Sequence, residues 1–126
     1  MLVIFLMVCL VVWGGASWVQ GQPEPELLTL GREVYEQNCA DCHRSNGEGL
    51  PVKFPALKGN PLVLGDPGPL LATIIHGRKG KMGLMPAWAE HLNDREIAAA
   101  ATYLRNAWGN QAPPVTPDAA AAARKR

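Results

Sequence analysis

The residues with the clearest chemistry are two cysteines and a histidine in the run C-A-D-C-H at positions 39–43. At this spacing Cys39 and Cys42 lie on one face of a helix, so both thiols can reach one bound group. A Cys-x-x-Cys pair alone is typical of a redox disulfide or of half a zinc site. A histidine directly after the second cysteine is instead typical of covalent haem attachment. We therefore predict one covalent haem, bound through Cys39 and Cys42, with His43 as an axial iron ligand.

An iron atom held by His43 needs a second axial ligand from elsewhere in the chain. The sequence offers two methionines and two histidines: Met82, Met85, His76 and His91. A methionine opposite a histidine raises the reduction potential relative to two nitrogen ligands, so the choice matters for function. Residue types and spacing alone leave these four candidates open.

The length and charge of the chain agree with a small haem protein. Of the 126 residues, about 20 at the front and 15 at the back are not typical of core, which leaves roughly 90. A chain of that size buries little apolar surface by itself, and a haem would supply apolar core and join distant segments. The formal net charge of +1 excludes a typical nucleic-acid binder, because such proteins need a strongly basic face.

The N-terminal residues 1–19 contain no charged side chain and are rich in Leu, Val and Ile. As a helix this run would be about 28 Å long, close to the roughly 30 Å hydrocarbon core of a bilayer. We interpret it as a membrane anchor. The alternative is a secretory signal that is cleaved near the small residues at 14–16 or at Gly21. Both interpretations place the following domain on the periplasmic side of a bacterial inner membrane, after a stiff linker at residues 20–27.

Three segments carry helix signals. The first is Thr29–Asn38, with Thr29 as the expected N-cap, and it leads directly into Cys39. The second is Pro69–His76, which begins with proline and is followed by glycine. The third begins with a capping box at Asn93 and Glu96 and is expected to stop at Gly109.

The rest of the chain is expected to lack long regular elements. Residues 45–66 are rich in glycine and proline and are predicted to be mostly loop, and residues 111–126 are predicted to be a disordered tail. No segment alternates between apolar and polar residues for long enough to predict a strand. The sequence therefore predicts an all-α fold with three to five helices around one haem, preceded by an N-terminal apolar helix.

The successive motifs of residues 28–110 resemble those of the class I bacterial cytochromes c, in the same order. The matching runs are G-R-E-V-Y-E-Q-N-C-A-D-C-H, F-P-A-L-K-G-N, I-I-H-G, M-P-A-W and Y-L-R-N-A-W-G-N. The resemblance implies a small cytochrome c domain over this range, with one covalent haem c. It also implies that Met85, which precedes Pro-Ala-Trp, is the second axial ligand.

The resemblance further implies several supporting contacts. The carbonyl of Pro55 is expected to accept the Nδ1 proton of His43 and so to orient its ring. Leu57 is expected to line the haem, and Trp88 either reaches a haem propionate or fills core. Other expected contacts are Phe54 at the haem, and Gly31 and Tyr35 against the last helix near Tyr103 and Leu104.

The function implied is transfer of single electrons between respiratory redox partners, by a carrier that is not itself an enzyme. The donor would be a dehydrogenase or a quinol-oxidising complex, and the acceptor a terminal oxidase or reductase. The chain would either diffuse or be a fixed subunit of a membrane oxidase or dehydrogenase complex. Two alternatives are a haem enzyme or ligand sensor whose Met85 detaches, and a structural subunit of a respiratory complex. Arg78, Lys79 and Lys81 are interpreted either as a docking patch or as a solvated loop.

Overall fold

The computed structural model describes residues 21–126, so the predicted anchor or signal at 1–19, with its apolar helix, lies outside the described residues. Between residues 21 and 126 the chain is mostly helical, which confirms the predicted all-α fold class. The elements in chain order are α1 (Pro25–Asn38), α2 (Ala40–His43), α3 (Pro61–Leu64), α4 (Pro67–His76), β1 (Arg78–Lys79), β2 (Leu84–Met85), α5 (Asp94–Leu104) and α6 (Pro117–Arg124). Within this range, no helix has the length and apolarity needed to cross a membrane.

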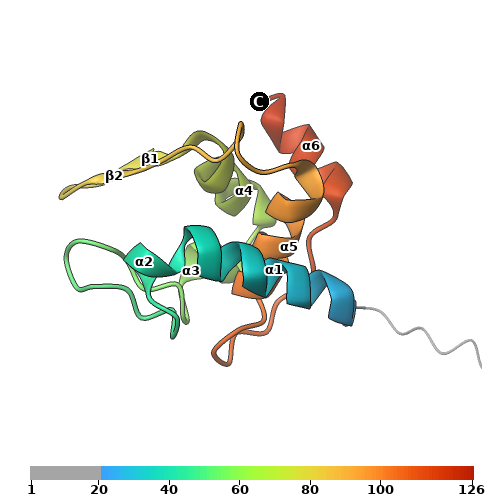
Figure 1. Cartoon of the computed structure of the whole chain (residues 1–126), viewed down its shortest axis with the longest axis horizontal. Coiled ribbons are helices and arrows are strands. Elements are labelled where there is room, and N and C mark those ends of the chain that lie inside the picture. The colour runs from blue at the N-terminus through green and yellow to red at the C-terminus, as the bar shows by residue number, and fades with distance from the viewer. Residues whose placement is uncertain (1–20) are drawn as a thin grey trace, which may run out of the picture.

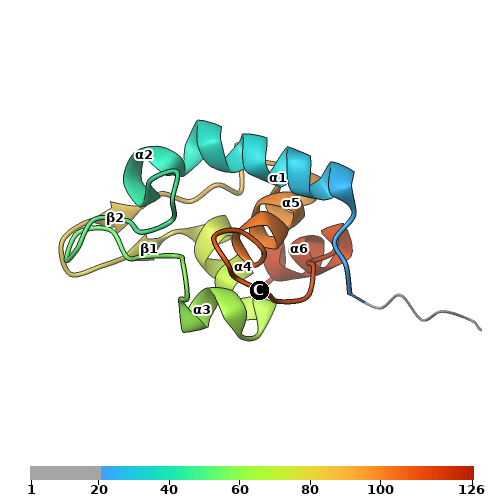
Figure 2. The ribbon, with the colours of Figure 1, turned by 90° about the horizontal axis from the view of Figure 1, so that it is seen from below.

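The first long helix, α1, packs against α5, which lies far from it in the sequence (Figure 1 and Figure 2). Gly31 lies at this contact, and a Cβ atom added there would be only 2.0 Å from the backbone oxygen of Ala99. The two helices can therefore approach this closely only with glycine at position 31. Next to it, the rings of Tyr35 and Tyr103 pack with centroids 5.5 Å apart. The expected packing of Gly31 and Tyr35 against the last part of the domain is present.

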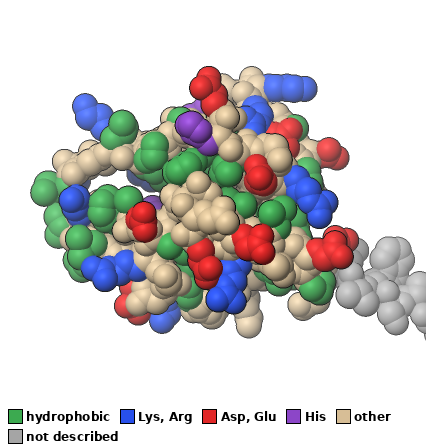
Figure 3. Space-filling view, in the orientation of Figure 1, with side chains coloured by type: hydrophobic (Ala, Val, Ile, Leu, Met, Phe, Trp, Pro, Cys, Tyr) green, Lys and Arg blue, Asp and Glu red, His purple; other side chains and the backbone are tan. Residues whose placement is uncertain are grey.

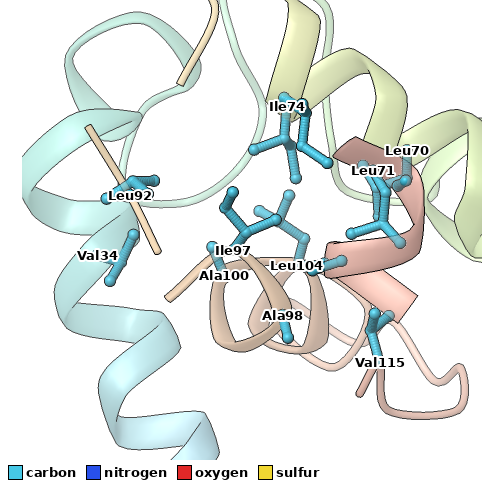
Figure 4. Close-up of a cluster of buried hydrophobic side chains, with 14 of the residues drawn as sticks. Val34, Leu70, Leu71, Ile74, Leu92, Ile97, Ala98, Ala100, Leu104 and Val115 are labelled. Carbon is cyan, nitrogen blue, oxygen red and sulfur yellow. The ribbon is translucent and has the colours of Figure 1, made fainter. Parts of the chain in front are cut away.

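The hydrophobic core lies between α1, α4, α5 and α6, with its side chains pointing toward one another (Figure 4). Val34 comes from α1, Ile74 from α4, and Ile97 and Leu104 from α5, and each is buried. The apolar positions repeat every three or four residues along each helix, which places them on one face. This core holds α1 and α4 in fixed positions, and these helices lead into the residues of the candidate site.

The boundaries of all three predicted helices differ from the expectation, and α4 begins at Pro67 instead of Pro69. Helix α1 begins at Pro25, with Glu24 as its N-cap, so the expected cap at Thr29 and the linker to residue 27 are wrong. Proline suits the first turn because its missing N–H would have no partner there, and the hydroxyl of Thr29 donates back to Pro25 O at 3.0 Å. Helix α5 begins with the predicted capping box of Asn93 and Glu96 but ends at Leu104, before Gly109.

The predicted disordered tail is also wrong, because residues 117–124 form α6. Val115, Ala120 and Ala123 are buried against the domain. Alanine is the strongest helix former, and its small side chain lets α6 lie close to its neighbours. The composition of this segment suits a solvated tail equally well, so contacts with α4 and α5 decide its structure.

A short hairpin forms in the glycine-rich segment after α4. Strands β1 and β2 are antiparallel, with Arg78 opposite Met85 and Lys79 opposite Leu84. Two residues per strand are too few to show alternation, so no sequence pattern could predict them. The hairpin projects from the helices at one end of the molecule (Figure 1).

The contact at Gly31 yields a stability prediction. In Gly31→Ala the new methyl group would clash with α5, and this cost should exceed the gain in helix propensity, for a net loss of about 1–3 kcal/mol. Thermal unfolding of the haem-loaded protein measures it. Gly83→Ala is the matched control, because nothing lies within 4 Å of its added Cβ, and its stability should stay within about 0.5 kcal/mol of wild type. Equal stability of the two variants would show that α1 and α5 tolerate separation.

Candidate haem site

The two cysteines and the histidine of the C-A-D-C-H run lie together on one short turn. Cys39 ends α1 and begins α2, and its carbonyl oxygen accepts hydrogen bonds from the backbone N–H groups of Cys42 at 3.2 Å and His43 at 2.9 Å. Cys39 is half-buried, Cys42 is exposed, and both are free thiols. His43 is buried, with 8% of its surface exposed. The turn therefore presents two thiols and an imidazole at a single place.

Two observations argue against the other uses of a Cys-x-x-Cys pair. Burial, and to a smaller extent the neighbouring Cys42, raises the pKa of Cys39 to about 11. The thiol is therefore protonated near neutral pH, whereas the attacking cysteine of a redox disulfide must be a thiolate. The raised pKa of Cys39 argues against a redox disulfide, and the described residues contain no group of three or more His, Cys, Asp and Glu side chains that could hold a metal ion.

The imidazole of His43 is oriented by the loop that follows it. Its Nδ1 atom lies 3.0 Å from the carbonyl oxygen of Pro55, which is the contact implied by the resemblance. Because a carbonyl can only accept, Nδ1 carries the proton and Nε2 keeps a free lone pair. A carbonyl partner of this kind also raises the basicity of a metal-bound histidine. The donor set and its tautomer therefore fit an axial ligand of haem iron.

Glycine at position 49 permits the fold of this loop. The N–H of Gly49 donates to the carbonyl oxygen of His43 at 2.9 Å, and Gly49 has a φ of +61°. An added Cβ would be 2.3 Å from Phe54 O and 2.7 Å from Pro55 O. Glycine at this position therefore lets the Pro55 carbonyl lie close enough to meet the ring of His43.

Two aromatic side chains brace the segment directly after His43. The Tyr35 hydroxyl donates to Arg44 O at 2.6 Å, and the Trp108 indole N–H donates to Ser45 O at 2.8 Å. Burial raises the pKa of the Tyr35 phenol, so it remains a donor at any physiological pH. The Trp108 ring also packs directly over Gly47. From the sequence, Trp108 was expected only as part of the helix that stops at Gly109, and this role was missed because the partner lies 63 positions away.

A third brace, Asn110, was also missed. Its side chain is buried, accepts from Gly59 N at 2.8 Å, and donates to Leu57 O at 3.2 Å and to Leu104 O at 2.8 Å. Leu57 itself is buried in the core. The available signal was a polar residue directly after Trp-Gly, at the point where the last predicted helix should stop.

The four candidates for the second axial ligand differ in their surroundings. Met85 is half-buried in β2 and packs against the core, whereas Met82 is 60% exposed and both His76 and His91 are exposed. The backbone of Met85 passes so close to Gly77 that an added Cβ there would be 2.5 Å from Met85 O. This arrangement favours Met85 among the four.

Residues 85–89 are held against the end of α4. The N–H of Trp88 donates to Ile74 O at 3.0 Å and the N–H of Ala89 donates to Ile75 O at 3.2 Å. The half-buried ring of Trp88 packs against the core, and it meets His91 edge to face with centroids 5.9 Å apart. These contacts agree with the core-filling interpretation of Trp88.

An open gap lies between the hairpin and the segment that contains α2 (Figure 3). Hydrophobic side chains lie along its rim in this view. The exposed large hydrophobic residues of the described chain all belong to these two segments, namely Leu50, Val52, Met82 and Leu84. A separate hollow of about 430 Å³ lies beside α2 and is lined by Cys42, Leu50 and Phe54 together with polar residues of the same segment, but by neither His43 nor Met85. Exposed apolar side chains around a gap, beside two thiols and an oriented imidazole, fit a large apolar cofactor such as haem.

Comparisons with known proteins relate the chain to c-type cytochromes. Residues 26–104 match the family described as "Cytochrome C oxidase, cbb3-type, subunit III". The chain is 37% identical over 91 residues to the cytochrome c subunit of quinone alcohol dehydrogenase from Gluconobacter oxydans, covering 66% of this chain and 19% of that protein. It is 40% identical over 87 residues to the cbb3-type cytochrome c oxidase subunit CcoP of Azospirillum brasilense, covering 64% of this chain and 28% of that protein.

A shorter relative and a solved structure give wider coverage. Cytochrome c-552 of Thermus thermophilus is 35% identical over 92 residues, which cover 64% of this chain and 69% of that protein. The crystal structure of the c-type cytochrome XoxG from Methylobacterium extorquens AM1 aligns with a TM-score of 0.54 and 24% identity. It covers 79% of this chain and 65% of that chain, and at this identity it supports the fold alone.

The geometry of the cysteine turn yields a chemical prediction. Thioether bonds survive denaturation, so haem should stay with the wild-type chain on a denaturing gel and should resist extraction by acid–acetone. The double variant Cys39→Ser/Cys42→Ser should lose all gel-stable haem, because no thiol remains on the turn. The third cysteine of the sequence, Cys9, lies outside the C-A-D-C-H run, so Cys9→Ser is the matched control and should keep the gel-stable haem. Extraction of haem from the wild-type chain would show that the attachment is not covalent.

Proposed function

Because the chain belongs to the family of cbb3-type cytochrome c oxidase subunit III, we propose that it transfers single electrons through its haem. The chain is a c-type cytochrome with covalently bound haem c. It spans only 19% and 28% of the dehydrogenase and oxidase relatives, so the activity and partners of the whole protein are part of this proposal.

In this proposal Cys39 and Cys42 hold the haem by thioether bonds, and His43 and Met85 are its axial ligands. The observation that carries the assignment is the contact between His43 Nδ1 and the Pro55 carbonyl. It places the proton on Nδ1 and leaves the lone pair of Nε2 free to bind iron. When bound, haem supplies a reversible one-electron couple, and the methionine and histidine pair favours a higher potential than two nitrogen ligands. The protein's part is to keep both ligands in place in both oxidation states.

The half-buried position of Met85 supports a carrier over a haem enzyme. An enzyme or sensor would need an open or easily opened axial position for its substrate. Here the backbone of Met85 packs against Gly77, and the two residues after Ala87 are hydrogen-bonded to the end of α4. These contacts favour a methionine that stays bound during electron transfer.

We propose respiratory redox proteins as partners, with a dehydrogenase or quinol-oxidising complex as donor and a terminal oxidase or reductase as acceptor. Relatives that carry the names of alcohol dehydrogenase and cbb3 oxidase subunits support this class. The domain would work on the periplasmic side of the inner membrane. Residues 1–19 would anchor it there as a free carrier or fixed subunit, or would be cleaved as a signal.

The hairpin supplies a candidate docking patch beside the haem gap. Arg78, Lys79 and Lys81 are exposed there, next to the exposed apolar side chains of Met82 and Leu84. A positive rim around apolar residues suits a partner with an acidic surface, since complementary charge mainly speeds encounter.

The ligand assignment is tested by two methionine variants. Met85→Ala should open the axial position, so that carbon monoxide binds the reduced protein, and should abolish the weak red-end absorption that reports sulfur on ferric haem. Met82→Ala is the matched control and should change neither property, because its side chain is 60% exposed. Loss of the band in Met82→Ala, with its retention in Met85→Ala, would show that the wrong methionine was chosen.

The docking patch is tested by salt dependence. Electron transfer to an acidic partner should slow as ionic strength rises, because salt screens exposed charges over roughly 8–10 Å. Replacing Arg78, Lys79 and Lys81 together by Gln should flatten this dependence in stopped-flow measurements. Replacing Lys125 and Arg126, which lie at the end of the chain after α6, serves as the control. An unchanged salt response in the triple variant would leave the hairpin as a solvated loop only.

A further inference from the structure

Helix α6 lies outside the segment 26–104 that matches the family, and it carries one arginine with an unusual set of partners. The guanidinium of Arg124 donates through Nε to the carboxylate of Asp94, through Nη1 to Ala89 O and through Nη2 to Leu92 O. The side chain is 27% exposed, so these partners are only partly open to water. Hydrogen bonds from a charged donor are stronger than those between neutral groups.

The two carbonyl groups belong to the chain that directly follows the proposed ligand Met85. We name residues 85–92 the ligand strap. On one side the strap is held by α4, through bonds from Trp88 N to Ile74 O and from Ala89 N to Ile75 O. On the other side it is held by Arg124. Ala89 is therefore held twice, through its N–H by α4 and through its carbonyl by α6.

Arg124 is presented by an anchored helix and not by a free arm. The chain before α6 is fixed by Thr102, whose hydroxyl accepts from Val115 N at 2.9 Å and donates to Val115 O at 3.3 Å. Arg105 Nε donates to Pro113 O at 2.8 Å. Ala120 and Ala123 are buried. The position of the guanidinium is thus set by the core, and so is the position of the strap that it holds.

We propose that Arg124 is a positioning residue for the sixth ligand, which keeps the strap closed so that external ligands do not displace Met85. The proposal rests on the assignment of Met85 under the proposed function. Displacement of a thioether requires the strap to move away from the iron, and such local opening has its own free energy, below that of global unfolding. The hydrogen bonds from Arg124 to Ala89 O and Leu92 O must stretch or break when the strap opens. Arg124 therefore raises the free energy of this opening.

The test is the binding of imidazole to the oxidised, haem-loaded protein, followed by loss of the red-end sulfur band. Arg124→Gln should bind imidazole roughly tenfold more tightly than wild type, a size typical of coupling between distinct sites. Arg124→Lys should fall between the two, because it keeps the charge but loses the planar set of donors. Lys125→Gln is the matched control, with the same loss of charge one residue further on, and should bind as wild type does.

A further variant separates positioning from general stability. Val63→Ala removes two methyl groups at a fully buried position of α3, so it should lower the melting temperature while leaving imidazole affinity unchanged, because α3 is not one of the elements that hold the strap. If Arg124→Gln lowers the melting temperature but shifts imidazole affinity by less than about twofold, Arg124 only stabilises the fold and the proposal is overturned. If Arg124→Gln does not retain haem, Arg124→Lys takes its place, and a shift in imidazole affinity of less than about twofold in that variant overturns the proposal.

Met85→Ala serves as the reference for the underlying assignment. It should bind imidazole more tightly than any Arg124 variant, because it has no thioether to displace. If it does so while the Arg124 variants bind as wild type does, the inference about Arg124 fails alone. If Met85→Ala binds no more tightly than wild type, Met85 is not the ligand and the proposed site fails as well.

Discussion

The close approach of α1 and α5 at Gly31 is the constraint on which the rest of the site depends. It brings the last turns of α1, which lead into Cys39, next to the segment after α5, where the ring of Trp108 packs against Tyr35 with centroids 5.2 Å apart. Since the haem-attaching turn begins where α1 ends, this helix contact sets the position of the turn. The aromatic rings of Tyr35, Tyr103 and Trp108 fill the space beside the crossing, each within 5.7 Å of another.

The two proposed iron ligands are held in different ways. His43 is on a helical turn, and its ring is oriented by a loop that side chains from α1 and the chain after α5 fasten to the core. Met85 is on a short strand without a helix to support it, and backbone bonds to α4 and the guanidinium on α6 hold the residues that follow it. The ring of His43 is therefore held by a direct hydrogen bond, whereas the position of Met85 depends on contacts made by the residues that follow it. A weak thioether ligand makes such support more important than it would be for a strong nitrogen ligand.

The relatives show how one domain serves in several settings. The chain matches under a third of the dehydrogenase and oxidase subunits but 69% of cytochrome c-552. In the structure, the gap and the basic hairpin lie at one end of the molecule, while α6 packs on α4 and α5 away from the hairpin (Figure 1). The family match ends at residue 104, so α6 lies beyond the segment that this chain shares with the family model.

The sequence by itself determined the cysteine turn, the capping box of α5 and the helical fold class, because each depends on residues within a few positions of one another. Residue spacing places Cys39 and Cys42 on one turn whatever surrounds them, and Asn93 and Glu96 cap a helix locally. Tertiary structure alone decided that residues 117–124 form a helix, since a short alanine-rich run is a stable helix only when its apolar face packs against a core. It also decided the roles of Trp108, Asn110 and Arg124, whose partners are brought near by the packing of helices. Long-range contacts of this kind leave no local pattern, because the partner of each polar group is chosen by the fold and not by its neighbours in the chain.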